Sequence, residues 1–177
     1  MGGRHIPEIC ALGVLLLGAA AARADVVVAT AGGFVVRSAV VVPASPAQAW
    51  KRFVAVASWW NKDHTFSGNS SNLYLRTAPG GCMCECLPGG GFVEHLHVVY
   101  ADKGRMLRLA GGLGPLQGMG VSGAYTVEFK ARGAQTEVVA IYVVNGFDAQ
   151  GLDKIAPVVD QVLSGQLQSF AAKLTNH

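Results

Sequence analysis

The alternation of hydrophobic and polar positions divides the chain into a strand, a short helix, a series of further strands and a C-terminal helix. Apolar residues at every second position predict a half-buried strand, and apolar residues at steps of three and four predict a helix. Turns rich in glycine or proline separate the segments. The predicted strands are 33–42, 73–77, 81–87, 92–101, 105–110, 124–131 and 136–144.

Two helices flank this series of strands. Ser45, Pro46 and Gln48 form the start of the first helix, as an N-cap, a first-turn proline and the partner residue of a capping box. Aromatic and apolar residues then recur at helical spacing and predict a helix over 46–60. The second helix is predicted over 157–175, where a long apolar stripe faces one side, with a separate turn before it.

Two segments between these elements are predicted to be irregular. Residues 61–72 are polar and rich in turn-forming residues, and long loops of this kind are often functional. Residues 111–123 contain six glycines and one proline. This second segment lacks the lysine-containing pattern of a phosphate-binding loop, so we expect it to bend the sheet or to cover an opening.

The N-terminus has the features of a secretory signal peptide. Fourteen uncharged residues at 9–22 form an apolar run, which is shorter than the roughly 20 residues of a membrane-spanning helix. The run ends in an A-x-A pattern at 22–24, which is typical of a cleavage site. We therefore expect a signal peptide over 1–24 and one mature domain over 25–177, periplasmic or secreted. An uncleaved membrane anchor is the alternative.

Composition narrows the class of protein. The chain is 51% hydrophobic but only 14% charged, which excludes an intrinsically disordered protein. A net charge of +3 is too small to predict nucleic-acid binding. Residues 25–177 hold 22 valines against 12 leucines, and valine favours strands, so the domain itself is apolar and rich in sheet.

This order of elements resembles the helix-grip fold of the SRPBCC superfamily, the START/Bet v 1-like proteins. The segments that carry the resemblance are VVVPASPAQAWKRFVAVASWW at 40–60, GLGPLQGMGVSGAYTVEF at 112–129, TEVVAIYVVNG at 136–146 and the terminal helix. The chain looks closest to the bacterial polyketide cyclase-like or Hsp90-ATPase-activator-like subgroup. The resemblance implies an α+β fold in which a curved antiparallel sheet encloses a long helix and an apolar cavity.

Three cysteines and two histidines form the densest group of chemically active residues. Alternate residues of a strand share a face, so Cys82, Cys84 and Cys86 should lie on one face, and His95 and His97 on one face of the next strand. If 87 pairs with 92, the opposed residues are Cys82 with His97, Cys84 with His95, and Glu85 with Glu94. A slip of one residue would instead bring Glu94 opposite Cys84.

Three interpretations of this group remain open. The favoured one is that the cysteines are small buried residues lining the sheet, with one histidine hydrogen-bonded inside. A disulfide is the second, although three mature cysteines leave one unpaired. The third is a zinc or copper site, for which the candidate ligands are Cys82, Cys84, Cys86, His95 and His97.

Aromatic and apolar side chains near the expected cavity mouth are the candidate ligand contacts. The residues predicted to contact a ligand are Trp59, Trp60, Phe66, Cys84, His95, Leu113, Gln117, Met119 and Tyr125. His95 and His64 are the candidate general bases, the latter beside Asp63.

These features predict an exported protein, monomeric or weakly dimeric, that binds a small hydrophobic, lipid-like ligand. We expect no cofactor, no nucleic-acid partner and no integral membrane segment after cleavage. A cyclase or isomerase with a cavity histidine as general base, and a thiol/imidazole metal-binding protein, are the alternatives.

Overall fold

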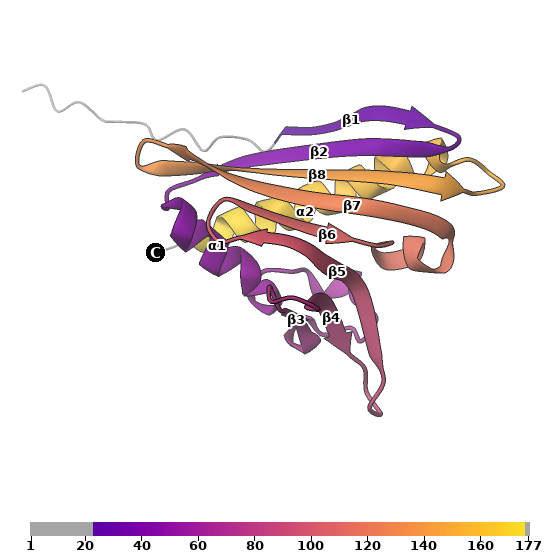
Figure 1. The fold of residues 1–177 in the computed structure, drawn as a ribbon, viewed down its shortest axis with the longest axis horizontal. Helices are drawn as coiled ribbons and strands as arrows, with labels where there is room; N and C mark the ends of the chain where they lie inside the picture. The colour runs from indigo at the N-terminus through magenta and orange to yellow at the C-terminus, as the bar shows by residue number, and fades with distance from the viewer. Residues whose placement is uncertain (1–22, 176–177) are drawn as a thin grey trace, which may run out of the picture.

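A computed structural model describes residues 23–175 of the chain (Figure 1). Residues 1–22 of the predicted signal peptide lie outside the described residues. The strands are β1 (Arg23–Thr30), β2 (Gly33–Val42), β3 (Leu73–Leu75), β4 (Cys82–Cys86), β5 (Phe92–Asp102), β6 (Met106–Ala110), β7 (Gly120–Arg132) and β8 (Gln135–Phe147). The α-helices are α1 (Pro46–Val54) and α2 (Ala156–Thr175).

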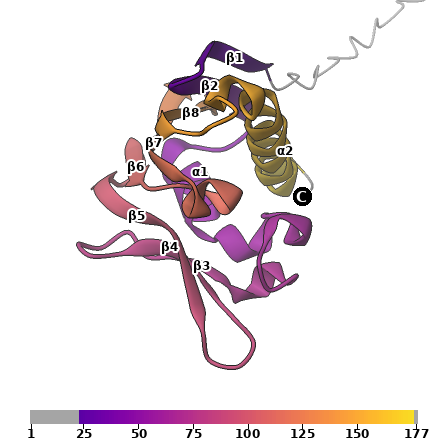
Figure 2. The ribbon, with the colours of Figure 1, turned by 90° about the vertical axis from the view of Figure 1, so that its right-hand side faces the viewer.

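The strands form one antiparallel sheet in the order β1-β2-β8-β7-β6-β5-β4-β3. Figure 2 shows the sheet curving from β1 to β3, with α2 on its open side. The predicted helix-grip fold is confirmed, with eight strands rather than seven. The additional strand is β1, whose valines at 26–28 are all exposed, so no alternation of buried and exposed positions marks it in the sequence.

The first helix begins as predicted but ends earlier. The capping box is formed, because Ser45 N donates to Gln48 Oε1 (2.9 Å) and Gln48 N donates to Ser45 Oγ (3.4 Å). The helix ends at Val54 instead of continuing to residue 60, and a 3₁₀ turn over Val56–Ser58 follows it. Trp59 and Trp60 follow this turn, and their ring centroids lie 5.6 Å apart.

The second helix, α2, packs against β2 and β1 and closes the concave side of the sheet. Its buried side chains include Leu163, Leu167 and Phe170, which join the hydrophobic core. A separate 3₁₀ turn over Leu152–Lys154 precedes it, as predicted. No helix among residues 23–175 is long and apolar enough to cross a membrane.

Candidate functional site

A cavity of about 490 Å³ lies between the sheet and α2. This volume falls within the range of small-molecule binding pockets. The lining residues come from the segment after α1, from β5 and β8, from the glycine-rich loop, from the turn before α2 and from α2 itself; they are Trp60, Asp63, His64, Thr65, Phe66, His95, Leu113, Gly114, Pro115, Leu116, Tyr142, Ile155, Val158, Val159, Val162 and Leu163. Most of these side chains are apolar, so the cavity suits a ligand that is itself mainly apolar.

The structure brings part of the predicted ligand contacts to this cavity. Trp60, Phe66, His95 and Leu113 all line it, and so does His64, which was predicted as a candidate general base. They come from three separate segments of the chain, so it is the fold that assembles them.

Trp59 does not line the cavity, because it faces the hydrophobic core. Its ring lies 5.1 Å from the Phe53 ring and 5.7 Å from the Phe170 ring, measured between centroids. Its Nε1 donates a hydrogen bond to the carbonyl oxygen of Phe53 (3.0 Å). Both tryptophans are buried in the hydrophobic core, with ring centroids 5.6 Å apart, but of the two it is Trp60 that also lines the cavity.

Four other predicted contacts also lie elsewhere, each for its own reason. Gln117 is exposed, and its Nε2 donates to the carbonyl oxygen of Glu94 (2.6 Å) on the backbone of β5. Met119 packs at the edge of the core. Tyr125 lies behind Tyr142 in an edge-to-face contact. Cys84, treated below, lies on β4 and is not among the lining residues.

A β-bulge in β5 decides which side chains of the hairpin β4–β5 reach the cavity. Cys82 is paired with His97, as predicted, but Cys84 is paired with Glu94, because the register shifts between them. The pairs of Cys84 with His95 and of Glu85 with Glu94, expected if 87 pairs with 92, are therefore wrong, and the alternative that brings Glu94 opposite Cys84 is confirmed. His95 is the extra residue of the bulge, and it is buried together with its neighbour Leu96.

The bulge also separates the two histidines. His95 lies on the buried face with Glu85, whereas His97 is exposed on the other face with Glu94. The five residues proposed above as metal ligands are accordingly not brought together, since His95 lies on the opposite side of the sheet from the cysteines.

Glu85 and His95 form a buried pair that the sequence analysis did not predict. His95 Nε2 lies 2.9 Å from Glu85 Oε2, and the side chains are 4% and 0% exposed. Glu85 also accepts hydrogen bonds from the backbone N–H groups of Phe66 (3.1 Å, to Oε2) and Ser67 (to Oε1). A glutamate between apolar neighbours in a buried strand was the only available signal, and its partner could not be identified without the bulge.

The environment of Glu85 favours its ionised form. Burial alone would raise the pKa of this carboxyl, but the hydrogen bonds from Ser67, Phe66 and His95 together outweigh burial and hold the pKa below its ordinary value. A carboxylate that accepts from Nε2–H fixes the orientation of the imidazole and leaves Nδ1 as the nitrogen able to accept or exchange a proton. Among the described residues, no group hydrogen-bonds to Nδ1 of His95.

His64, the other candidate base, lacks a comparable partner. The neighbouring carboxylate of Asp63 binds Lys62 Nζ (3.0 Å) instead of the imidazole. The carbonyl oxygen of His64 accepts a hydrogen bond from Trp60 Nε1 (3.0 Å), which fixes the segment that carries it. His64 thus contributes to the cavity wall, and the predicted acid/base pair with Asp63 is not formed.

Tyr142 attaches the glycine-rich loop to the sheet. Its hydroxyl donates to the carbonyl oxygen of Gly111 (2.8 Å) and accepts from the backbone N–H of Leu113 (2.9 Å). Burial raises the pKa of Tyr142 to about 12, so the hydroxyl stays neutral and can serve both contacts. The loop, predicted to be irregular, contains a 3₁₀ turn over Gly114–Gly118 and covers one side of the cavity.

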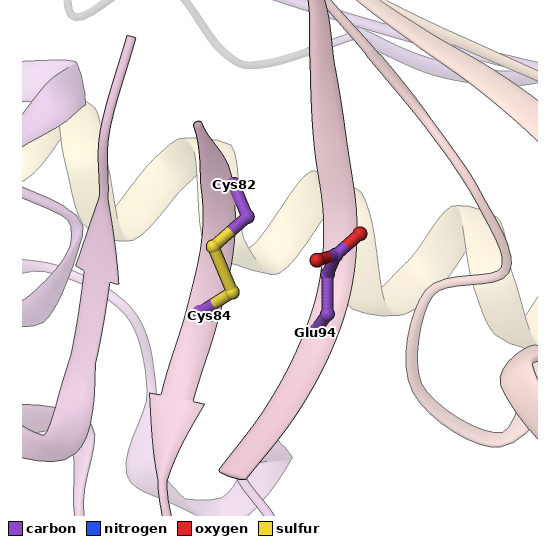
Figure 3. A group of neighbouring side chains, drawn as sticks. All are labelled: Cys82, Cys84 and Glu94. Carbon is purple, nitrogen blue, oxygen red and sulfur yellow. A yellow bond between two sulfur atoms is a disulfide. The ribbon is translucent and has the colours of Figure 1, made fainter. Parts of the chain in front are cut away.

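The cysteines lie together on one face of β4, as predicted, but two of them are not free. Cys82 and Cys84 form a disulfide, with Cα atoms 5.5 Å apart (Figure 3). Cys86 is free and exposed. The favoured interpretation is therefore wrong for the cysteines, since two are bonded to each other and Cys86 is exposed, but its buried, hydrogen-bonded histidine is confirmed as His95. The alternative of one disulfide with one cysteine left over agrees with the structure.

The comparisons with known proteins identify the fold and no closer relationship. No family model matches the chain, and no curated protein matches its sequence. Among solved structures, Ara h 8.0201 superposes with a TM-score of 0.58 at 13% identity, covering 82% of this chain and 100% of that one. CalU16 from Micromonospora echinospora superposes with a TM-score of 0.51 at 11% identity, covering 86% and 88%.

An uncharacterised protein from Rhizobium leguminosarum gives a TM-score of 0.56 at 18% identity and covers 81% of this chain and 97% of that one. At such low identities these similarities establish architecture alone. The chain has the helix-grip fold, which is the fold of the Bet v 1-like proteins.

Proposed function

We propose that this protein binds a small, mainly apolar ligand that carries one polar group, in the cavity between the sheet and α2. The observation that carries the proposal is the combination of an apolar cavity of about 490 Å³ with the buried side chain of His95 at its wall, which is paired with Glu85. Small-molecule sites typically combine apolar walls with a few fixed polar groups.

The apolar part of the ligand supplies most of the binding free energy in this proposal. Burial of apolar surface contributes roughly 25 cal/mol per Å². Val159 and Val162 on α2 line the cavity together with Trp60 and Leu116, so a ligand would meet apolar side chains from α2, from the segment after α1 and from the glycine-rich loop.

In this proposal His95 orients the ligand in the cavity. Because its Nε2 is held by Glu85, its Nδ1 can accept a hydrogen bond from a ligand hydroxyl. The Phe66 ring lies 5.7 Å from the imidazole and shields this end of the cavity. A ligand hydroxyl placed here would fix which end of the ligand enters first.

A matched pair of variants tests the proposal. The test is fluorescence titration with an anilinonaphthalene sulfonate probe, followed by displacement with lipid extracts of the host. Val159→Trp fills the cavity and should weaken probe binding by about tenfold or more, a loss of roughly 1.4 kcal/mol. Val99→Trp adds the same ring at an exposed position of β5 and should leave binding unchanged. Equal binding by both variants would place the probe outside the cavity and refute the proposal.

The pairing of Glu85 with His95 also favours a second candidate function, that of a cyclase or isomerase. A histidine oriented by a buried carboxylate is the usual arrangement of a general base. In this case His95→Gln should abolish turnover of a substrate while preserving its binding. Retained turnover would exclude His95 as the base.

We further propose that the protein is exported and that residues 1–24 are removed. The support is the apolar run and the A-x-A pattern in the sequence, together with a disulfide, which persists in oxidising compartments. The intact mass of the protein isolated from its host should equal that of residues 25–177. A mass that includes residues 1–24 would contradict export by cleavage.

A further inference from the structure

A second group of side chains with metal-binding chemistry lies on the outer face of the β4–β5 hairpin, away from the cavity. The two sulfur atoms of Cys82 and Cys84 and a carboxylate oxygen of Glu94 all lie within 4.8 Å of one another (Figure 3). The strand register explains this, since Cys84 is paired with Glu94 and Cys82 with His97.

His97 adds a fourth donor beside this group. Its Nδ1 lies 3.8 Å from Glu94 Oε1, and both side chains are about half exposed, 55% and 49%. Exposed side chains can turn toward a bound ion without disturbing the core, while Cys84 is 3% exposed and keeps its sulfur sheltered from solvent. Together the four side chains offer two sulfurs, one oxygen and one nitrogen.

The disulfide itself does little to hold the fold together. It joins residues two positions apart in one strand, so it links no separate elements. The entropy that a cross-link removes from the unfolded chain grows with the loop it closes, and this loop is among the shortest possible. A role in stability therefore does not account for this pair of cysteines.

We propose that Cys82, Cys84, Glu94 and His97 form a redox-gated site for a thiophilic cation such as Zn²⁺. In the oxidised state the sulfurs are bonded to each other. A dithiol reductant transfers two electrons and two protons: its own two thiols become a disulfide, the bond between Cys82 and Cys84 breaks, and two thiols result. Zn²⁺ then displaces the two thiol protons and binds the thiolates.

The donor set suits zinc. Zn²⁺ takes four ligands in tetrahedral geometry from cysteine sulfur, histidine nitrogen and carboxylate oxygen. Two thiolates, each carrying one negative charge, match the charge of the ion, and Glu94 would add a third. Cys86 does not belong to the group, although it lies on the same face of β4.

The site is independent of the ligand cavity. The bulge at His95 places Glu94 and His97 on the outer face and His95 on the inner face. Loss of zinc binding should therefore leave the cavity intact, and probe binding in the cavity serves as a check that each variant is folded.

Calorimetric titration of the full chain with Zn²⁺ tests the proposal, with one sample reduced by a phosphine and one left oxidised. The reduced protein should bind one zinc ion per chain, and the oxidised protein should bind at least about 100-fold more weakly. Cys82→Ser and Cys84→Ser should cause a comparable loss of zinc affinity. Glu94→Gln and His97→Ala should each weaken zinc binding by about tenfold. Cys86→Ser is the control and should bind zinc like the parent chain.

Co²⁺ in place of zinc gives an independent readout, because thiolate ligands produce a charge-transfer absorption band. This band should appear in the reduced parent chain and in Cys86→Ser, and be lost in Cys82→Ser. Equal zinc affinity in both redox states, no zinc binding by the reduced chain, or loss of binding in Cys86→Ser would each overturn the proposal.

Discussion

His95 Nε2 lies 2.9 Å from Glu85 Oε2, and both side chains are buried from solvent. The contact joins the bulge of β5 to the neighbouring strand β4, and two backbone N–H groups of the segment that forms the cavity wall bind the same carboxylate. One ionised side chain thus connects two strands and a loop, and this is why its removal should have several measurable effects.

Glu85→Gln should lower the free energy of unfolding by about 2 kcal/mol, because hydrogen bonds to a charged group are stronger than those to an amide. Chemical denaturation at neutral pH measures this difference. Glu94→Gln replaces an exposed carboxylate of the same hairpin and should change the stability much less.

Because Glu85 is ionised in the folded chain, we also expect the stability of the protein to depend on pH. The pKa of Glu85 is lower in the folded chain than its ordinary value of 4.5, so its stabilising contribution is complete above pH 4.5 and is lost as the pH falls through the folded pKa. Unfolding curves recorded from neutral to acidic pH should therefore show a decline that is smaller in Glu85→Gln. An identical decline in both proteins would contradict the assignment.

Ionisation of Asp160 should have the opposite effect on stability to that of Glu85. Burial, and to a smaller extent the carboxylate of Asp25, raise the pKa of Asp160 above 3.8, and its Oδ1 is buried without a hydrogen-bond partner among the described residues. The ionised form thus destabilises the folded state at neutral pH, and this cost disappears as the pH falls through the folded pKa.

Asp160→Asn should consequently stabilise the protein by about 1 kcal/mol at neutral pH, and the gain should shrink toward acidic pH. Chemical denaturation at neutral and at acidic pH measures the free energy of unfolding of both proteins. Asp25→Asn should stabilise the protein less than Asp160→Asn. Destabilisation by Asp160→Asn would mean that the carboxylate has a partner in solution.

Tyr142→Phe should loosen the glycine-rich loop, because the hydroxyl makes two hydrogen bonds to its backbone, at Gly111 and Leu113. A loss of about 2 kcal/mol is expected for leaving these groups without a partner. Hydrogen exchange of the Leu113 amide should become faster. Tyr125→Phe is the matched control, since the Tyr125 hydroxyl makes no hydrogen bond within the described residues, and it should leave this exchange unchanged.

Gly123→Ala should also destabilise the protein, for a steric reason. A Cβ atom at this position would lie 2.5 Å from Cε2 of Tyr142, and a ring packed in the core cannot move freely. A cost of about 1–3 kcal/mol is typical of such overpacking. Gly118→Ala introduces a Cβ into open space and should have little effect on the melting temperature. Equal melting temperatures for both variants would contradict the close contact with the ring.

The fold could be predicted from the sequence because its main elements have strong local signals. The capping residues of α1, the alternation along β7 and the apolar stripe of α2 each follow from the period of a single element. The exposed strand β1 has no such period, since none of its valines is buried, and it was missed.

The site was less predictable because it depends on pairing between elements. Trp60, Phe66 and His95 were expected at the cavity from residue type and position, and they line it; Trp59 was expected there on the same grounds but packs in the core against Phe53 and Phe170. The contact between Glu85 and His95 requires a bulge, and an inserted residue leaves no mark in the pattern of a strand that carries polar residues on both faces.

The bulge in β5 changes which residues of the strand, odd-numbered or even-numbered, are buried. On one side of it the odd-numbered residues Val93 and His95 are buried; on the other side the even-numbered Leu96 is buried and His97 is exposed. If substitutions were chosen on the assumption that alternate residues stay on one face along the whole strand, some of them would change the outer surface instead of the cavity. Deletion of one residue at the bulge would exchange the two surfaces for half of the strand, so the identity of each face depends on the length of the chain as much as on its composition.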